Sequence, residues 1–149
     1  MIDWIRSFWY GLGGLNDLEL LILKAIRSKI AHEAVLIWDA QISDINKVQR
    51  LPNNIESNFY SLSLKNGKPV KDLKKAFPNQ KKELLIAKVK LKYDEIEIDV
   101  DVWAVHGFLF SLEFSDNPKH LVEKLGSYAS NSKIEIACEI TSDLLSTGL

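Results

Sequence analysis

The sequence predicts an α+β fold, an antiparallel β-sheet of about 5–6 strands with N-terminal helices and one short C-terminal helix packed against it. Three observations support this prediction: a capped amphipathic helix, a long hairpin whose register satisfies charge and apolarity together, and strands that follow one another through short turns. Sequential hairpins favour this class over a doubly wound parallel sheet. With 149 residues and no repeat or linker, the chain fits a single α+β domain spanning residues 1–149.

The first clear helix begins after Asn16, a favourable N-cap with Glu19 three residues on, as in a capping box. Apolar residues then recur at helical spacing as far as Ile30. The aromatic residues 4–10 predict a helical turn or two that lies over the core. The glycine-rich residues 11–14 are interpreted as a connector, because no strand precedes them and no Lys-Ser/Thr pair follows, as a phosphate loop requires.

From Val35 the period changes to two, which predicts a half-buried strand through Ser43 that extends toward Leu51. A second strand is predicted from Phe59 to Leu64. Residues 68–78 have apolar residues at helical spacing, which allows one short helix. The strand predicted from Val35 would bury Leu36, Trp38, Ala40 and Ile42.

The strongest structural inference is a hairpin that turns at Asp94 and Glu95, so that paired residue numbers add to 189. In this register three lysines face three acids on one side of the sheet, while four apolar pairs meet on the other. A slip by one residue would move the charged side chains into the core. The expected ion pairs are Lys92–Glu97, Lys90–Asp99 and Lys88–Asp101.

The next strand is predicted from Phe108 to Ser115. Pairing Phe110 with Ala104 requires that the numbers of paired residues add to an even total. A two-residue turn at His106 and Gly107 would instead give an odd total. We therefore expect a longer loop or a glycine bulge there, with Gly107 at positive φ. A short helix capped by Asn117 follows, and a last strand carries four apolar residues on one side. The residues that these two strands would bury are Phe108, Phe110, Leu112, Phe114, Ile134, Ile136, Cys138 and Ile140.

The composition favours a cytoplasmic globular protein. A hydrophobic fraction of 46% and a charged fraction of 26% are ordinary for folded domains. The single cysteine excludes an internal disulfide and suits a reducing compartment. The apolar stretch at the N-terminus ends at Gly11 and has an acid where a signal peptide carries basic residues, so neither a signal peptide nor a membrane span is expected.

The sequence contains no catalytic constellation, so we lean toward a protein that is not an enzyme, with no cofactor and no metal. Cys138 could act as a nucleophile with a histidine as base, but its position among isoleucines predicts a buried, inert thiol. His32, His106 and His120 lack the spacing of metal ligands. The alternative is a small enzyme or ligand-binding domain whose site assembles in three dimensions around His106 or Cys138.

Charge is distributed unevenly along the chain, although the net charge is only −1. Residues 65–92 hold ten lysines and two acids, while residues 93–116 hold seven acids and no lysine or arginine. The basic segment could follow a phosphate backbone. However, it lacks arginine, and part of it faces the acidic strand, so nucleic-acid binding is the third hypothesis and is disfavoured.

The leading hypothesis is a non-catalytic protein-binding module of bacterial type, such as an immunity-like inhibitor or a regulatory accessory protein. The run 105–114 resembles stretches of small bacterial proteins, and no function is carried over from that likeness. A basic protein is the expected partner, a homodimer is left open, and no membrane is expected. Trp103 falls on the charged side of its strand, where a large aromatic is typical of a binding hot spot. The candidate binding residues are Trp103, Asp99, Asp101, Glu113 and Trp9.

Overall fold

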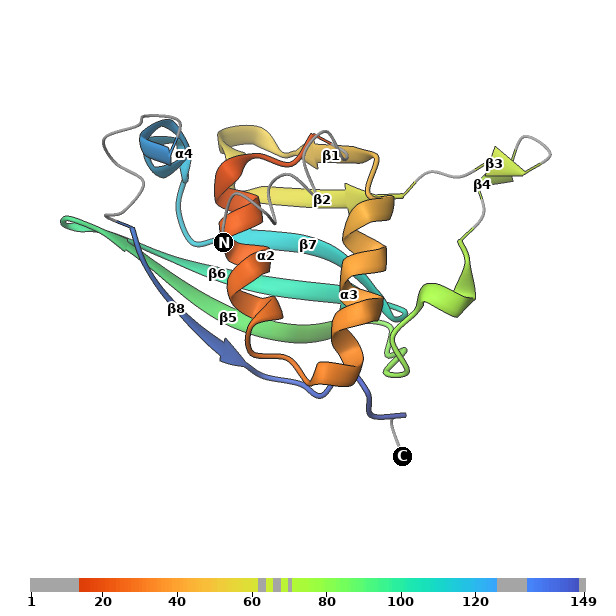
Figure 1. Cartoon of the computed structure of the whole chain (residues 1–149). Helices are drawn as coiled ribbons and strands as arrows, with labels where there is room; N and C mark the ends of the chain where they lie inside the picture. The colour runs from red at the N-terminus through yellow and green to blue at the C-terminus, as the bar shows by residue number, and fades with distance from the viewer. Residues whose placement is uncertain (1–13, 62–63, 66–67, 70, 126–133, 148–149) are drawn as a thin grey trace.

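The computed structural model describes residues 14–61, 64–65, 68–69, 71–125 and 134–147. A six-stranded antiparallel sheet in the order β1-β2-β7-β6-β5-β8 carries two long helices over one face (Figure 1). The α+β fold with helices on an antiparallel sheet is therefore confirmed. The helical elements are α2 (Asp17–Arg27), α3 (His32–Asp44), η1 (Pro52–Asn54), η2 (Leu73–Lys75) and α4 (Lys119–Leu125). The strands are β1 (Lys47–Arg50), β2 (Glu56–Tyr60), β3 (Leu64–Lys65), β4 (Lys68–Pro69), β5 (Leu84–Tyr93), β6 (Ile96–Val105), β7 (Phe108–Phe114) and β8 (Glu135–Ile140).

Helix α2 begins where the sequence predicts. The side chain of Asn16 accepts a hydrogen bond from the Glu19 amide at 2.8 Å, and the Glu19 carboxylate accepts one from the Asn16 amide at 2.8 Å. This capping box satisfies two amides that the helix itself leaves unpaired. Glu19 also contacts Arg50 of β1 at 2.6 Å, which ties the helix to the edge of the sheet. The helix buries Leu18, Ile22, Leu23 and Ile26 against the sheet.

The strand predicted from Val35 is wrong, because residues 32–44 form helix α3. The buried apolar residues are Ala34, Trp38 and Ile42, which recur every four positions, whereas Leu36 is 80% exposed. Over a short apolar run the periods of a strand and a helix share several positions, so alternation alone did not separate them. The continuation predicted toward Leu51 is a separate strand, β1.

The β5–β6 hairpin confirms the predicted register. Lys88 pairs with Asp101, Lys90 with Asp99, and Tyr93 with Ile96 across the strands, and a bulge follows only beyond Ala87. The ion pairs agree in part with the prediction. Lys88 contacts Asp101 at 3.2 Å as expected, but Lys90 contacts Glu97 diagonally at 2.9 Å instead of Asp99. A diagonal neighbour is within reach of a long lysine side chain.

The β6–β7 hairpin has the expected even-sum register only from Trp103 and Ser111 outward, and nearer the turn Ala104 pairs with Leu109 instead of Phe110. The turn has two residues, His106 at φ 50° and Gly107 at φ 87°, so the positive φ of Gly107 is confirmed and the longer loop is wrong. The register shifts inside β7 instead, because Ser111 pairs with Trp103 and Leu109 with Ala104. The extra residue, Phe110, therefore leaves the side predicted for it, and Leu109 is buried in its place.

The remaining elements differ from the prediction mainly at their ends. The second strand starts at Glu56 rather than Phe59, and the short helix expected within residues 68–78 is the three-residue η2. The Asn117 side chain accepts a hydrogen bond from the Lys119 amide at 3.0 Å, which confirms the cap of α4. Residues 4–10, including Trp9, lie outside the described part of the chain.

No helix in the described ranges is both long enough and apolar enough to cross a membrane.

Candidate functional site

Helices α2 and α3 lie over the same face of the sheet, which we call the inner face (Figure 1). The opposite face is called the outer face, and no helix of the described ranges lies over it (Figure 1). Strand alternation puts every second residue of the six strands there. The lysines of β5 and the acids of β6 belong to this face, as does Trp103.

A row of acids crosses the outer face at right angles to the strands. Glu56 of β2 pairs with Glu113 of β7, and Glu113 pairs in turn with Asp101 of β6. We call these three residues the acidic row. Beyond it Lys88 of β5 pairs with Asp101 and with Glu139 of β8. Like charges directly opposite each other on adjacent strands are destabilising, so the row is a local cost to the fold.

Only part of this row is compensated within the described residues. Asp101 has Lys88 at 3.2 Å, and Glu56 accepts a hydrogen bond from the Asn58 amide group at 3.3 Å. Glu113 lies between them with no ion pair or hydrogen bond to its carboxylate in the described part of the chain. Partial burial raises the pKa of Glu113, and the neighbouring charges of Glu56 and Asp101 raise that pKa further. The middle of the row is therefore the place where a cation would be most favourable.

A second row, two residues along the strands, runs beside the acidic one. Asn58 pairs with Ser111, and Ser111 pairs with Trp103. Ser111 is only 3% exposed although no helix of the described ranges lies above it, while Trp103 is half-buried. The Trp103 indole nitrogen is enclosed and has no acceptor among the described residues. The Trp103 ring is therefore positioned by packing and not by a hydrogen bond from its indole nitrogen.

Two aromatic side chains extend this surface toward the edge of the sheet. Phe110 meets Tyr60 of β2 edge to face, with ring centroids 5.6 Å apart, and the Tyr60 hydroxyl bonds to the Gln49 side chain at 3.2 Å. Sequence reasoning missed Phe110 because the bulge in β7 changes its side, and a bulge within a strand has no clear sequence mark. Glu56 was missed because the predicted strand began at Phe59, and residues 56–58 contain no apolar side chain that would have extended the alternation.

The structure brings together three of the five candidate binding residues. Trp103, Asp101 and Glu113 lie on neighbouring positions of β6 and β7. Asp99 lies on the same face one step further along β6, where its amide donates to the Ser115 hydroxyl at 2.9 Å. Trp9 is outside the described residues.

The two residues of the alternative enzyme hypothesis do not meet. Cys138 is half-buried on the inner face and is level with Val89 and so with Val100, while His106 lies in the turn at the far end of β6. Six residues of extended strand separate these levels by roughly 20 Å. Burial raises the pKa of the Cys138 thiol, which is the opposite of what a nucleophile needs. Within the described ranges no group of three or more potential ligand side chains is arranged to hold a metal ion.

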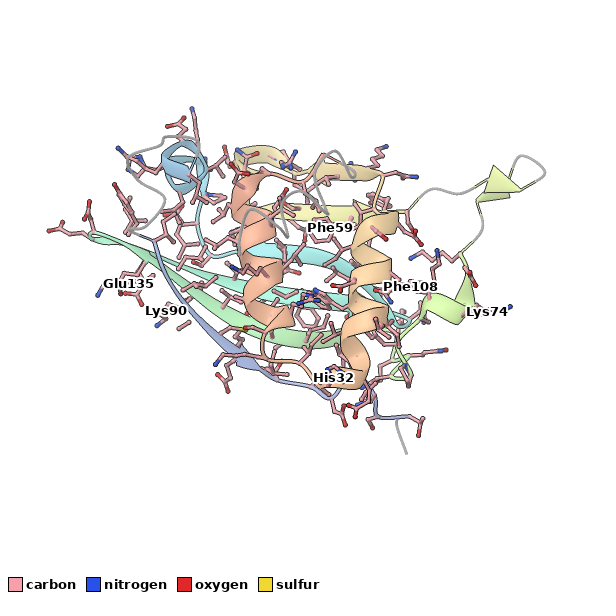
Figure 2. All side chains as sticks on the ribbon, in the orientation of Figure 1. His32, Phe59, Lys74, Lys90, Phe108 and Glu135 are labelled. Atoms are coloured by element: carbon pink, nitrogen blue, oxygen red, sulfur yellow. The ribbon has the colours of Figure 1, made fainter. Side chains whose placement is uncertain are left out.

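The lysines of residues 65–92 that the structure describes do not form one surface. Lys88 and Lys90 lie on the outer face and contact acids. Lys71 and Lys75 lie near η2, at the end of the molecule where Figure 2 labels Lys74 and away from Lys90. A continuous basic groove that follows a phosphate backbone is not formed by these residues.

No family model matches the sequence, and neither a curated protein nor a solved structure matches the chain.

Proposed function

We propose that the protein is a non-catalytic binding module of bacterial type, an immunity-like inhibitor or a regulatory accessory protein, whose outer sheet face docks a basic partner protein. One observation carries the proposal: the acidic row lies beside the half-buried Trp103 on a face over which no described helix lies. Such a face combines a charge that attracts a cation with an aromatic side chain that a partner can cover.

The geometry favours arginine or lysine as the group that the partner contributes. Glu56 and Glu113 are register partners on adjacent strands, so their carboxylates can flank one cationic side chain. The flat ring of Trp103 can stack against a guanidinium or an aliphatic stem. A cation between Glu56 and Glu113 would also relieve the repulsion that raises the pKa of Glu113.

The stability of the isolated chain gives no reason for this arrangement. Opposed acids in the centre of a face disfavour folding, and a lysine in place of Glu113 would remove the cost at once. Residues that lower stability in this way are typical of binding and active sites, where function and stability make different demands. The same repulsion acts between two copies of the acidic row, so it disfavours a homodimer formed through this face.

The test is a comparison of partner affinity between matched variants. A partner is first captured from the native lysate after nuclease treatment, and its affinity is then measured by calorimetry at low and high salt. Trp103→Ala and Glu113→Gln should each weaken binding about tenfold or more, the scale of a hot-spot residue. Glu135→Gln is the matched control, because Glu135 lies on the outer face of β8, away from the acidic row (Figure 2).

Wild-type affinity should fall as salt is added, since exposed charges are screened. Equal affinity for the wild type and both folded variants would place the binding surface elsewhere and would refute this docking face. Capture that disappears after nuclease treatment would favour nucleic acid instead.

A further inference from the structure

A cleft of about 780 Å³ opens at the other end of the molecule, away from the acidic row. It lies between the C-terminal half of α3, the ends of β2 and β7, and the segment around η2. Figure 2 shows the labelled Phe59, Phe108 and Lys74 at this end. A volume of this size falls within the usual range for small-molecule sites, roughly 300–1,000 Å³.

The cleft exists because two neighbouring strands separate. Strands β2 and β7 pair over only three residues and part after Asn58 and Ser111. The chain of β2 continues to Phe59 and Ser61, while β7 runs back to Phe108, and all three residues line the cleft. The bulge at Phe110 lies at the point of separation. Bulges of this kind occur often beside binding and active sites, where they redirect side chains.

Gln41 of α3 holds the walls in place. Its amide group donates to the carbonyls of Lys75 at 2.7 Å and Gly107 at 2.9 Å, and its oxygen accepts from the Leu109 amide at 2.8 Å. Leu109 lies beyond the last residue pair of β2 and β7, and its amide is bonded by Gln41. One buried side chain thus links the η2 segment, the β6–β7 turn and β7, so the cleft is preformed rather than created by a ligand.

The cleft has an apolar floor and a cationic rim. Phe108 and Leu109 are buried in the floor, and Leu73 stands 73% exposed at the rim. The ammonium group of Lys71 lies 4.4 Å from the centroid of the Phe108 ring. Of the other charged groups at the rim, the Lys75 ammonium pairs with Asp44 at 2.7 Å. The Asp72 side chain accepts a hydrogen bond from the backbone amide of Lys74, and Lys74 also lines the cleft.

Lys71 differs from the other cations of this rim. Partial burial lowers the pKa of Lys71, and no carboxylate of the described residues offsets that shift. Lys71 is exposed as a whole, but its ammonium group lies over the Phe108 ring and has no acid as a described contact. A single negative charge on a ligand would supply the ion-pair partner that the Lys71 ammonium lacks.

We propose that this cleft binds a small amphipathic monocarboxylate, with its carboxylate against the Lys71 ammonium and its apolar body against Phe108 and Leu73. Three lysines and two acids line the cleft, a net charge of +1. The attraction of this charge doubles for a dianion, whereas the cost of desolvating the ligand rises with the square of its charge, so one negative charge is favoured over two. This site is independent of the outer face and uses neither His106 nor Cys138. It makes the chain a ligand-binding domain in addition to a docking module.

The experiment is an NMR titration of the isotope-labelled full chain with 4-phenylbutyrate and its neutral analogue 4-phenylbutan-1-ol. The carboxylate should give saturable shifts at Lys71, Leu73, Phe108 and Leu109. Lys71→Met removes the charge and keeps an apolar stem, so it should weaken the carboxylate about tenfold and the alcohol far less. Lys82→Met is the matched control, since Lys82 is exposed and does not line the cleft.

Phenyl phosphate serves as the dianionic probe and should bind more weakly than 4-phenylbutyrate. The proposal is overturned if neither probe saturates these amides in the millimolar range. It is also overturned if Lys71→Met, with its melting temperature unchanged, weakens carboxylate and alcohol equally, or if the phosphate binds more tightly. Shifts confined to the outer face would likewise contradict it.

Discussion

The two faces of the sheet are built from the same strands, yet they follow different physical rules. On the inner face Val89, Val100 and Val102 are almost fully buried beneath the helices. On the outer face Asp101, which lies between Val100 and Val102 on β6, meets Glu113 of β7 as a like charge. Burial of apolar surface supplies most of the stability of a domain, and single surface charges contribute little. The outer face can therefore carry residues that do not favour folding.

The two tryptophans measure this difference most directly. Trp38 of α3 is fully buried and packs on Phe77 with ring centroids 6.3 Å apart, while Trp103 is half-buried on the outer face. Trp38→Ala should lower the free energy of unfolding by about 4 kcal/mol, because it leaves a large cavity in the core.

Trp103→Ala should cost about 1 kcal/mol, since the half-buried ring leaves no closed cavity behind. The indole N–H has no described acceptor in either tryptophan, so it does not separate the two variants. Urea unfolding of both variants checks the ranking. Equal losses would mean that the outer face is as important to the fold as the inner face, and the contrast drawn between them would fail.

A second comparison contrasts two glycines with similar backbone conformations. Gly107 has φ 87°, and a Cβ added there would meet the Phe77 carbonyl oxygen at 2.9 Å, whereas Gly14 has φ 75° and open space around it. Gly107→Ala should therefore cost about 3 kcal/mol, from left-handed backbone strain together with the displacement of the segment that walls the cleft.

Gly14→Ala should cost only about 1 kcal/mol, the strain of the backbone alone. Thermal and urea unfolding of the two variants separate conformational strain from close packing. If both alanines cost the same, the contact between the β6–β7 turn and Phe77 contributes nothing to stability.

Glu113→Gln should stabilise the protein slightly at neutral pH, by less than about 1 kcal/mol, because solvent screens this exposed side chain. The direction of this change in stability follows from the raised pKa of Glu113. Glu113 holds its proton more tightly in the folded chain than in the unfolded chain, so the folded state loses stability as pH rises through this range.

The gain from Glu113→Gln should therefore vanish well below pH 4.5, the ordinary pKa of this group, where both states carry the proton. Unfolding free energies at acidic and neutral pH, with Glu135→Gln as the control, test this. A loss of stability at neutral pH would show that the acidic row is favourable in the free protein, and the case for a functional site there would weaken.

The smallest expected effect concerns which acid, Glu97 or Asp99, interacts more strongly with Lys90 in the β5–β6 hairpin. A double-mutant cycle between Lys90 and Glu97 should give a measurable favourable coupling, because the two side chains contact at 2.9 Å. The cycle between Lys90 and Asp99, which are direct register partners, should give a weaker one. The reverse order would show that the cross-strand pair dominates in solution and that the diagonal contact does not.

Local sequence patterns were sufficient to predict those elements for which the alternative arrangement would be much less stable. The cap at Asn16 and the register of the β5–β6 hairpin are such cases, since a slip of one residue would bury charge. Residues 35–43 were assigned to a strand because their alternation fits both periods. Only contact with the rest of the core, where Trp38 meets Phe77, decides for the helix.

The candidate sites divide in the same way. Strand parity alone put Trp103, Asp101 and Glu113 on one face, since alternation is a local property of the chain. The other residues of that face, and the cleft, could be found only from the tertiary structure. Glu56 joins the acidic row through pairing between distant strands, and the bulge at Phe110 becomes visible only when β7 is aligned with β6. Lys71 meets Phe108 across 37 positions of sequence, a distance over which no local pattern carries information.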